Sequence, residues 1–372
     1  MKLKLEKIQL NHKWLYFLAT LVLIVMIVCI YHDYDLYTQP IVKVKTTEFI
    51  NKTETIGGNQ NKEIIYNQNL TAERMNGSQK GQLITLENSY TSFKVYGQKY
   101  NVGDELFVSI DSDAGLTGKI TGVKRDKYIA VMVGLFVLSL LIVGRRQGLF
   151  SILSIVMNIV VFHFALDIYE YNENNHLLLV CSGAVILCTL FSLLLVSGRN
   201  EKTYAAIIAT LISTFLTLLI AYAVIQATSG NGLHYEGMEF ATQSPPKVFI
   251  ASVLVGSLGA VMDVAIMISS SIYELHEKNN AISNKELIAS GREIGKDIMG
   301  TMANVLLFAY VSGTIPMMIL YLENGSTIGF TFSMNLPLEL ARALAGGIGI
   351  VLTVPIGLYT CVGLIRKKEA TK

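Results

Sequence analysis

The sequence has few charged residues: 16% of its 372 residues are Asp, Glu, Lys or Arg, against about 25% in ordinary soluble domains. Its formal net charge of +2 gives no indication of a nucleic-acid partner. The four cysteines, Cys29, Cys181, Cys188 and Cys361, all lie inside apolar runs without metal-ligand spacing. We therefore interpret them as small buried hydrophobic residues and predict no metal site.

Patterns of the common catalytic sites are also lacking. The chain contains no P-loop, no H-E-x-x-H and no G-x-S-x-G motif. Its aspartates do not form an intramembrane pair at equal depth, because Asp263 lies well inside an apolar run whereas Asp297 lies at the rim of the next one. We therefore predict a protein that is not an enzyme and that needs no cofactor.

Long apolar runs take the place of these features, and 52% of the residues are hydrophobic. A helix of about 20 apolar residues crosses the hydrocarbon core of a bilayer. We expect an all-α polytopic membrane protein with about eight transmembrane helices, embedded in a lipid bilayer. The runs that meet or approach the required length are 14–31, 128–143, 148–166, 176–196, 203–226, 247–271, 297–322 and 338–364.

The basic residues predict the orientation of these helices, because cytoplasmic loops are enriched in Lys and Arg. With the amino terminus inside, the short outer connections 167–175, 227–246 and 322–333 carry no basic residue. Lys124, Arg125, Lys127 and Lys247 lie at outer edges against this trend. The basic residues on the inner side outnumber them, so we expect both termini to be cytoplasmic. These residues are Lys2, Lys4, Lys7, Lys13, Arg145, Arg146, Arg199, Lys202, Lys278, Lys285, Arg292, Lys296, Arg366, Lys367, Lys368 and Lys372.

Changes in composition divide the chain into three parts. Residues 1–31 form the cytoplasmic amino terminus and the first transmembrane helix, residues 32–127 an extracytoplasmic domain, and residues 128–372 a seven-helix membrane domain. The first run could instead be a signal peptide, but no small-residue cleavage site follows it. We therefore interpret it as an uncleaved anchor.

The outer domain is predicted to be rich in β-strands. Alternating segments at 41–50, 80–88 and 105–110 indicate strands, and Gly and Asp occur where tight turns need positive φ. A small antiparallel barrel or sandwich is the fold that these segments favour. Residues 51–79 are polar enough to indicate a mobile loop.

Asp263 is the strongest candidate for a functional residue inside the apolar runs. An ionisable side chain in a span is costly unless it faces water or a partner. Gly256, Gly259, Asp263 and Ser270 recur at helical spacing and therefore share one helix face. Small residues on this face allow another helix to approach closely.

The next run carries a matching polar face with Asp297, Thr301 and Asn304. Asp263 and Asn304 lie about 12 and about 10 Å from the same end of their runs, so a contact between them is geometrically allowed. One interpretation is an ion or substrate pathway with Asp297 at its cytoplasmic mouth. The other is that Asp263 is protonated and joins the helices through Asn304 or Ser270.

Two further pairs of ionisable residues are secondary candidates. Arg342 lies near the outer end of the last run, with Glu339 three residues earlier as its expected partner. His163 and Asp167 are four residues apart near the outer side, which suits either a proton relay or an interfacial ion pair.

Glycines at helical spacing predict close contacts between helices. Such faces suit packing within one chain and also dimerisation, so a second copy of the chain or a related membrane protein is an expected partner. The glycines concerned are Gly256, Gly259, Gly300, Gly346 and Gly349.

Two segments resemble the YibE/F family of bacterial membrane proteins: GSLGAVMDVAIMISSSIYEL at 256–275 and SGREIGKDIMGTMANVLLFAYVSGTIPMMIL at 290–320. The resemblance extends to a β-rich domain after the first run, with the segments KGQLITLEN and YNVGDEL. The Asn-rich first half of that domain departs from the family pattern. Membership implies a bacterial plasma membrane protein and implies no particular reaction. The residues that carry the resemblance are Gly259, Asp263, Gly291, Gly295, Asp297, Gly300 and Asn304.

Three functions fit these features. The first is a transporter for an ion or small solute with Asp263 in its pathway. The second is a non-transporting assembly or sensing protein that acts through its outer domain. The third is a permease subunit coupled to a separate ATPase through a short amphipathic helix at 284–294, which a capping box from Ser283 to Glu286 opens.

Overall fold

The computed structural model describes residues 21, 24–25, 28–56, 62–91, 97–110, 117–171, 176–238 and 244–370. The chain divides into two compact units, Met1–Leu149 and Phe150–Lys372. The expected first span, 14–31, lies largely outside the described residues, as do the basic residues before it.

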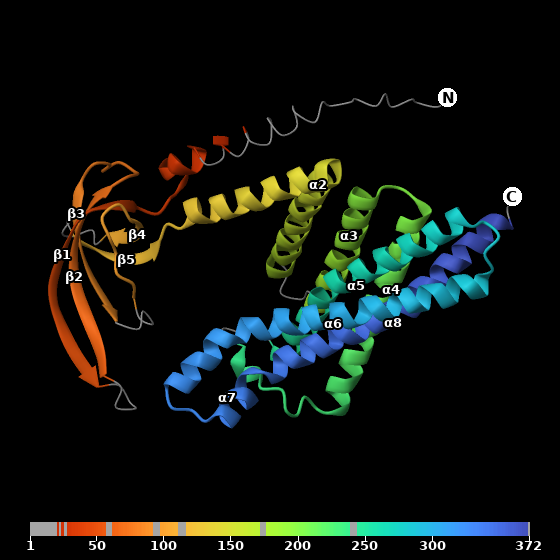
Figure 1. Cartoon of the computed structure of the whole chain (residues 1–372). Helices are drawn as coiled ribbons and strands as arrows, with labels where there is room; N and C mark the ends of the chain where they lie inside the picture. The colour runs from red at the N-terminus through yellow and green to blue at the C-terminus, as the bar shows by residue number, and fades with distance from the viewer. Residues whose placement is uncertain are drawn as a thin grey trace. The chain divides into compact units, whose positions relative to one another are not determined.

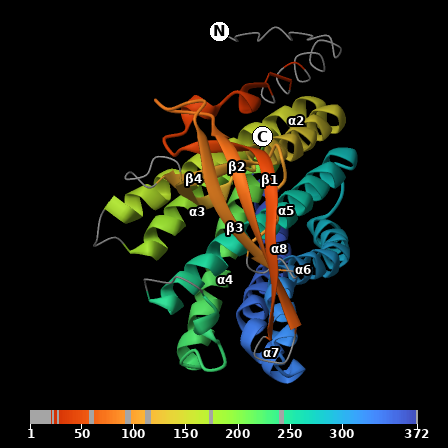
Figure 2. The same ribbon diagram turned by 90° about the vertical axis from the view of Figure 1, so that its left-hand side faces the viewer.

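The first unit contains a closed five-stranded barrel with the strand order β1-β2-β3-β5-β4. The pair β3 and β5 is parallel, and the other neighbours are antiparallel. Figure 2 shows β1, β2 and β3 as long neighbouring strands. The strands are β1 (Ile41–Ile56), β2 (Lys62–Arg74), β3 (Leu83–Thr91), β4 (Glu105–Ile110) and β5 (Thr117–Val123).

Alternating apolar residues explain the interior of the barrel. Every second residue of a strand faces the same side, and these side chains fill the core. The prediction of a β-rich domain is confirmed, including the strands expected near 41–50, 80–88 and 105–110. The core residues are Val42, Val44, Leu70, Ala72, Ile84, Leu86, Tyr100, Leu106 and Val108.

The predicted mobile loop at 51–79 is wrong. β1 continues to Ile56 and pairs with β2, which occupies 62–74, in a long antiparallel hairpin from Val42 opposite Arg74 to Ile56 opposite Lys62. The sequence suggested a loop because the described side chains at 51–54 are polar and exposed. Cross-strand hydrogen bonds do not require apolar side chains, so the polar strand persists beyond the barrel core.

A single buried amide ties the segment before β1 to the barrel. The Asn76 side chain donates hydrogen bonds to the carbonyls of Tyr34 (3.2 Å), Tyr37 (3.0 Å) and Gln39 (2.9 Å). Its Oδ1 accepts from the backbone N–H of Ile41 at 2.8 Å. This amide therefore fixes the short 3₁₀ helix η1 (Tyr34–Leu36) against the turn that follows β2.

Helices make up most of the rest of the chain. Six of those described are long and apolar enough to cross a membrane: α2, α3, α4, α5, α6 and α8. They are α2 (Asp126–Tyr171), α3 (Leu177–Ser197), α4 (Glu201–Ala227), α5 (Pro245–Lys278), α6 (Asn284–Glu323) and α8 (Pro337–Glu369), with the short helices η2 (Tyr235–Gly237) and α7 (Ile328–Asn335) in connections. Against the expected number of about eight, these six helices contain seven of the eight expected runs, and the remaining run, 14–31, lies largely outside the described residues.

The long helix α2 accounts for one part of this difference, because it contains both of the runs expected at 128–143 and 148–166. Its backbone leaves helical geometry at Arg145, where φ is 49° and ψ is −123°. A methyl group added to Gly148 would collide with the carbonyl oxygen of Leu140, so this break requires glycine there. The two runs are thus separated at Arg145, where the sequence predicts the connector between them.

The segment expected as a short separate helix at 284–294 is instead the first part of α6. Its capping box is present, since Ser283 accepts from the N–H of Glu286 while the Glu286 carboxylate accepts from the N–H of Ser283. Leu287 is buried in the core, and side chains at Gly291 would overlap Leu358 and Ile272. Residues 284–294 therefore pack against α5 and α8, and the helix continues without a break into the apolar run.

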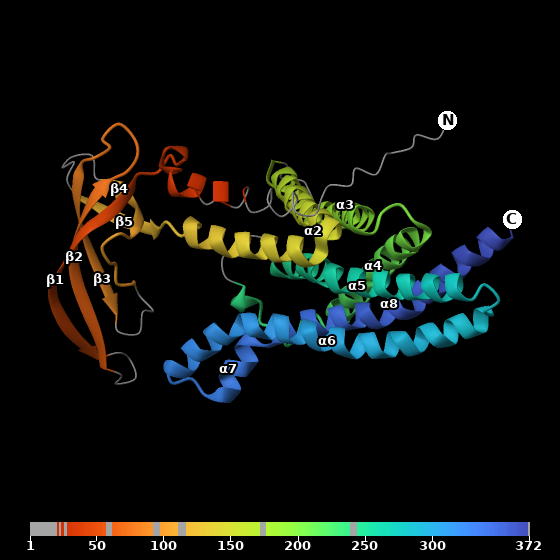
Figure 3. The ribbon, with the colours of Figure 1, turned by 45° about the horizontal axis from the view of Figure 1, so that its top comes forward.

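The second unit is a bundle in which α5 and α8 contact each other, and both contact α4 and α6. Figures 1 and 3 show α6 and α8 running side by side, with α7 joining them at one end. Gly346 and Gly349 of α8 are buried, and a methyl group at Gly349 would lie 2.8 Å from Thr217 Oγ1 and 2.9 Å from Val261 Cγ2. Gly349 thus permits close contact with both α4 and α5.

The glycines differ in their surroundings. A side chain at Gly346 would approach Leu306, and one at Gly256 would collide with the Tyr310 hydroxyl. At Gly259 and Gly300 an added methyl group would meet no described atom within 4 Å. Close packing within the chain is therefore a property of Gly256, Gly346 and Gly349, while Gly259 and Gly300 lie on open helix faces.

We expect Gly349→Val to destabilise the protein by about 1–3 kcal/mol, because the new side chain overlaps Thr217 and Val261. Gly347→Val is the matched control, since no described atom lies within 4 Å of a methyl group at that position. Thermal unfolding of the full chain in detergent measures both. Equal losses in the two variants would contradict the close contact at Gly349.

Candidate functional site

Asp263 lies on an exposed face of α5, in the middle of its apolar segment. No hydrogen bond or ion pair of its carboxylate occurs within the described part of the chain. Gly259, one turn earlier, leaves open space on the same face, and the half-buried Ser270 lies two turns later. The structure therefore presents an unpartnered carboxylate on a candidate membrane-spanning helix.

The polar residues of α6 are also exposed. Thr301 bonds within its own helix, donating to the carbonyl of Ile298 at 2.9 Å, and Asp297 lies one turn before it. Asn304 lines an apolar groove of about 480 Å³ between α6 and α8, with Leu307, Leu344 and other residues of these helices. This polar face of α6 thus borders a groove rather than the interior of the bundle.

The structure does not join Asp263 to Asn304 by a described hydrogen bond. Gly256 lies beside Tyr310 and Ile272 beside Gly291, so α5 and α6 are antiparallel and Asp263 lies within about one turn of Asn304 along the helix axes. The two residues therefore lie at similar heights along their helices, as the sequence predicts. Asn304, however, is rotated by about 120° around α6 from Tyr310 and faces the groove with α8.

A row of buried hydroxyl groups on α4 was missed by the sequence reasoning, which considered ionisable residues first. Thr210, Ser213, Thr214 and Thr217 are at most 1% exposed in the bundle. Thr217 donates to the carbonyl of Ser213 at 2.8 Å, whereas the other three hydroxyl oxygens have no hydrogen-bond partner among the described residues. Spacings of three and four residues were the signal in the sequence.

These unpartnered hydroxyls are costly, because a buried polar group without a hydrogen bond destabilises a protein by about 1–3 kcal/mol. Across from them, Thr353 of α8 donates to the carbonyl of Gly349 at 2.6 Å. The interior between α4, α5 and α8 therefore contains hydroxyl groups among apolar side chains. These hydroxyls can form hydrogen bonds with a solute or water.

Another polar contact joins the second half of α2 to α3. Ser154 donates to the hydroxyl of Ser192 at 2.9 Å, and the Asn158 amide donates to the same oxygen at 2.9 Å. These groups satisfy each other, so they act as a hydrogen-bonded joint between helices rather than as an open site.

Of the secondary candidates, Arg342 and Glu339 form an ion pair of 2.6 Å that is mostly buried. Arg342 also donates to Ser252 of α5 at 3.1 Å and lies 5.5 Å from the centre of the Phe249 ring. This pair therefore ties the start of α8 to α5. His163 and Asp167 lie 3.6 Å apart on an exposed face of α2, without a third group to relay a proton among the described residues.

In the first unit, Lys124 is the centre of a buried charge cluster at the base of the barrel. Its side chain is 1% exposed, and its Nζ lies 2.7 Å from Asp33 and donates to Asp126. The ammonium also lies over the rings of Tyr34 (5.4 Å) and Tyr37 (5.2 Å). Cation–π attraction and two carboxylates together stabilise the charged amine.

Glu105 extends this cluster. It accepts from the Tyr34 hydroxyl at 2.8 Å and lies 3.6 Å from Lys127, while Tyr37 donates to Asp126 at 3.0 Å. The cluster therefore connects η1, strand β4 and the first turn of α2. This position links the barrel directly to the start of a candidate membrane-spanning helix.

The cluster shifts the ionisation of its members. Burial alone lowers the pKa of Lys124, but hydrogen bonds to Asp126 and Asp33 and their charges raise this pKa above its usual range. Burial and the hydrogen bond to Glu105 raise the pKa of Tyr34, and burial and the bond to Asp126 raise the pKa of Tyr37. The folded state thus favours the protonated forms of all three.

The model of YibE/F-like proteins matches residues 132–367, which is more than half of the chain. This chain belongs to the YibE/F family. The YibE/F family N-terminal domain matches residues 35–123, which include the barrel. No curated protein and no solved structure matches this YibE/F protein.

Lys124→Met should destabilise this YibE/F protein by about 3–5 kcal/mol at neutral pH, because the partly buried carboxylates of Asp33 and Asp126 lose their counter-ion. Lys119→Met is the control, since Lys119 is an exposed residue of β5. Thermal unfolding of the full chain in detergent compares them. An equal effect of the two substitutions would contradict a stabilising role of the cluster.

The same cluster predicts a loss of stability in alkali. A pKa raised by folding stabilises the protein below the ordinary value, which is 10.5 for Lys124 and 10.0 for the tyrosines, and this stabilisation is lost as pH rises through the folded pKa. We expect the unfolding temperature of the wild type to fall above about pH 10. Lys124→Met should show a smaller alkaline fall, and an unchanged fall would contradict this origin.

Proposed function

We propose that this YibE/F protein is a permease that moves a proton or small cation across the membrane, with Asp263 as the residue that binds it. The observation that supports this most is the unpartnered carboxylate of Asp263 on a 34-residue candidate membrane helix. An uncompensated charge at such depth is too costly to be retained for packing alone, and intramembrane carboxylates commonly carry protons or ions.

The surroundings of Asp263 support this proposal. Gly259 leaves space beside the carboxylate for a solute, and Ser270 provides a hydroxyl on the same face. Asp297, Thr301 and Asn304 form a polar face on α6 that is exposed toward the surroundings of the bundle.

We propose a bacterial plasma membrane as the location, with the barrel outside and both termini in the cytoplasm. Basic residues at the ends of several helices support this orientation, including Arg199 before α4, Lys278 at the end of α5 and Arg366 at the end of α8. Lys124, which lies on the other side in this orientation, is buried in the charge cluster and therefore does not count as an exposed loop charge.

Proteoliposomes loaded with a pH- or cation-sensitive dye test this function. We expect the wild type to conduct protons or a small cation, and Asp263→Asn to reduce the flux to that of empty vesicles, because the neutral amide cannot carry or balance the charge. Glu274→Gln is the control, since Glu274 is on the same helix but is exposed and paired with Lys278.

Both variants are first compared with the wild type for insertion and thermal stability. A wild type without flux across a panel of monovalent and divalent cations and protons would overturn the proposal. Flux that persists in Asp263→Asn would remove this residue from the pathway.

A second candidate is a sensing or assembly protein that binds a component of the cell envelope through the barrel. The Lys124 cluster favours it, because it connects β4 and η1 rigidly to the start of α2 and would transmit a change in the barrel to the helix. Under this function Asp263→Asn retains activity in cells, whereas Lys124→Met loses it. The opposite pattern favours the permease.

A further inference from the structure

A second polar site lies at the far ends of three helices in the second unit. It is a cavity of about 410 Å³ where the start of α4 meets the ends of α5 and α8. This volume lies within the range of small-molecule sites in proteins. Its lining residues include Glu201, Tyr273, His276, Glu277 and Lys368.

Two buried atoms of this cavity have no hydrogen-bond partner in the described structure: the hydroxyl oxygen of Tyr273 and Nδ1 of His276. Tyr273 is 7% exposed, so its hydroxyl cannot be satisfied by bulk water. Buried polar groups are nearly always paired. Two such atoms in one cavity leave hydrogen-bonding positions open to a bound molecule.

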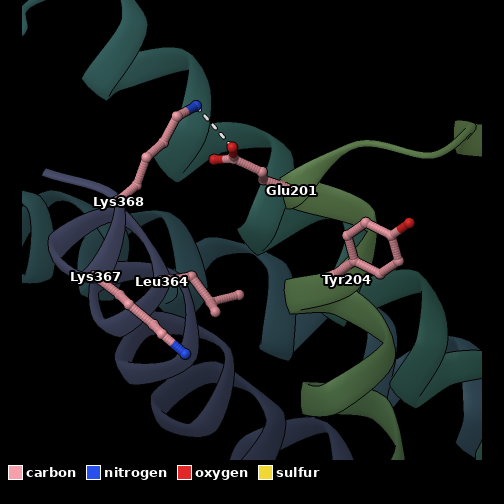
Figure 4. A pocket seen from close by; sticks show the side chains of 5 residues that line it. All are labelled: Glu201, Tyr204, Leu364, Lys367 and Lys368. Atoms are coloured by element: carbon pink, nitrogen blue, oxygen red, sulfur yellow. Dashed lines mark ion pairs between the residues drawn. The ribbon is translucent and has the colours of Figure 1, made fainter. Parts of the chain in front are cut away.

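The charges of the lining indicate which kind of molecule fits. Three carboxylates, from Glu201, Glu277 and Glu369, outnumber the single ammonium of Lys368. Lys368 and Glu201 form an ion pair (Figure 4), with 2.7 Å between Nζ and Oε1. His276 Nε2 is 3.7 Å from Glu369 Oε1. His276 Nδ1 and the Tyr273 hydroxyl add two polar atoms to this lining. The cavity thus offers negative charge and hydrogen-bond acceptors.

A dehydrated metal ion does not suit this lining, because the described residues contain no group of three His, Cys, Asp or Glu placed to hold one. An organic ammonium group combines positive charge with N–H donors, so it can satisfy Tyr273 and His276 while balancing the carboxylates. We propose that this cavity binds a small organic amine, such as an aliphatic diamine. The site is separate from Asp263, and binding there does not require transport.

Thermal unfolding of the full chain in detergent, titrated with 1,4-diaminobutane, tests this proposal. We expect saturable stabilisation by the diamine and none by its permethylated analogue, which keeps the charges but has no N–H donor. Saturable binding also predicts that 1,4-butanediol, which lacks charge, has no effect.

Tyr273→Phe gives the decisive comparison. Because no described residue is a hydrogen-bond partner of this hydroxyl, its removal should leave the unliganded unfolding temperature unchanged or higher, while diamine binding weakens about tenfold or more. Tyr204→Phe is the matched control: Tyr204 is exposed and lines the neighbouring pocket shown in Figure 4 rather than this cavity.

The proposal would be overturned by no shift with the diamine, by an equal shift with its permethylated analogue, or by unchanged binding in Tyr273→Phe. A stabilisation by Mg²⁺ alone that exceeds that of the diamine would also overturn it. The Asp263→Asn variant should bind the diamine as the wild type does. A wild type without flux would therefore not contradict diamine binding at this cavity. A wild type that does not bind the diamine would likewise not contradict the permease function.

Discussion

The close approach of α8 to its neighbours is the contact on which the second unit depends. In a bilayer the lipid is as apolar as the helix surfaces, so association depends on tight packing and on polar contacts rather than on exclusion of water. The buried glycines of α8 supply that packing, with Gly346 against Leu306 of α6 and Gly349 against Thr217 of α4 and Val261 of α5. One helix thereby contacts three others.

This packing also determines which polar groups are hidden and which are available. The hydroxyls of Thr210, Ser213 and Thr214 become buried because α4 is pressed against the bundle, whereas Asp263 stays on the outer face of α5. The unit therefore combines an unusually polar interior with an exposed carboxylate. If the buried hydroxyls and the Asp263 carboxylate were purely structural, they would need hydrogen-bond partners, and the described residues do not provide them.

The two units use opposite means to hold charge. At the base of the barrel, Lys124 is paired with two carboxylates and lies over two aromatic rings, so its charge is compensated. Where the start of α4 meets the ends of α5 and α8, carboxylates remain in excess, and two buried polar atoms have no hydrogen-bond partner among the described residues. Complete compensation suits a structural connection, while incomplete compensation suits a site that binds something.

The sequence by itself determined the apolar candidate spans, the family and the β-rich domain, because apolar run length and helical or strand periodicity are local properties. It could not determine that 51–79 continues a hairpin, since cross-strand partners are distant in the sequence. It also could not show that Asn304 faces α8, that Lys124 is a buried counter-ion, or that Tyr273 and His276 share a cavity. Those features depend on the rotation and crossing of elements, which only tertiary packing decides.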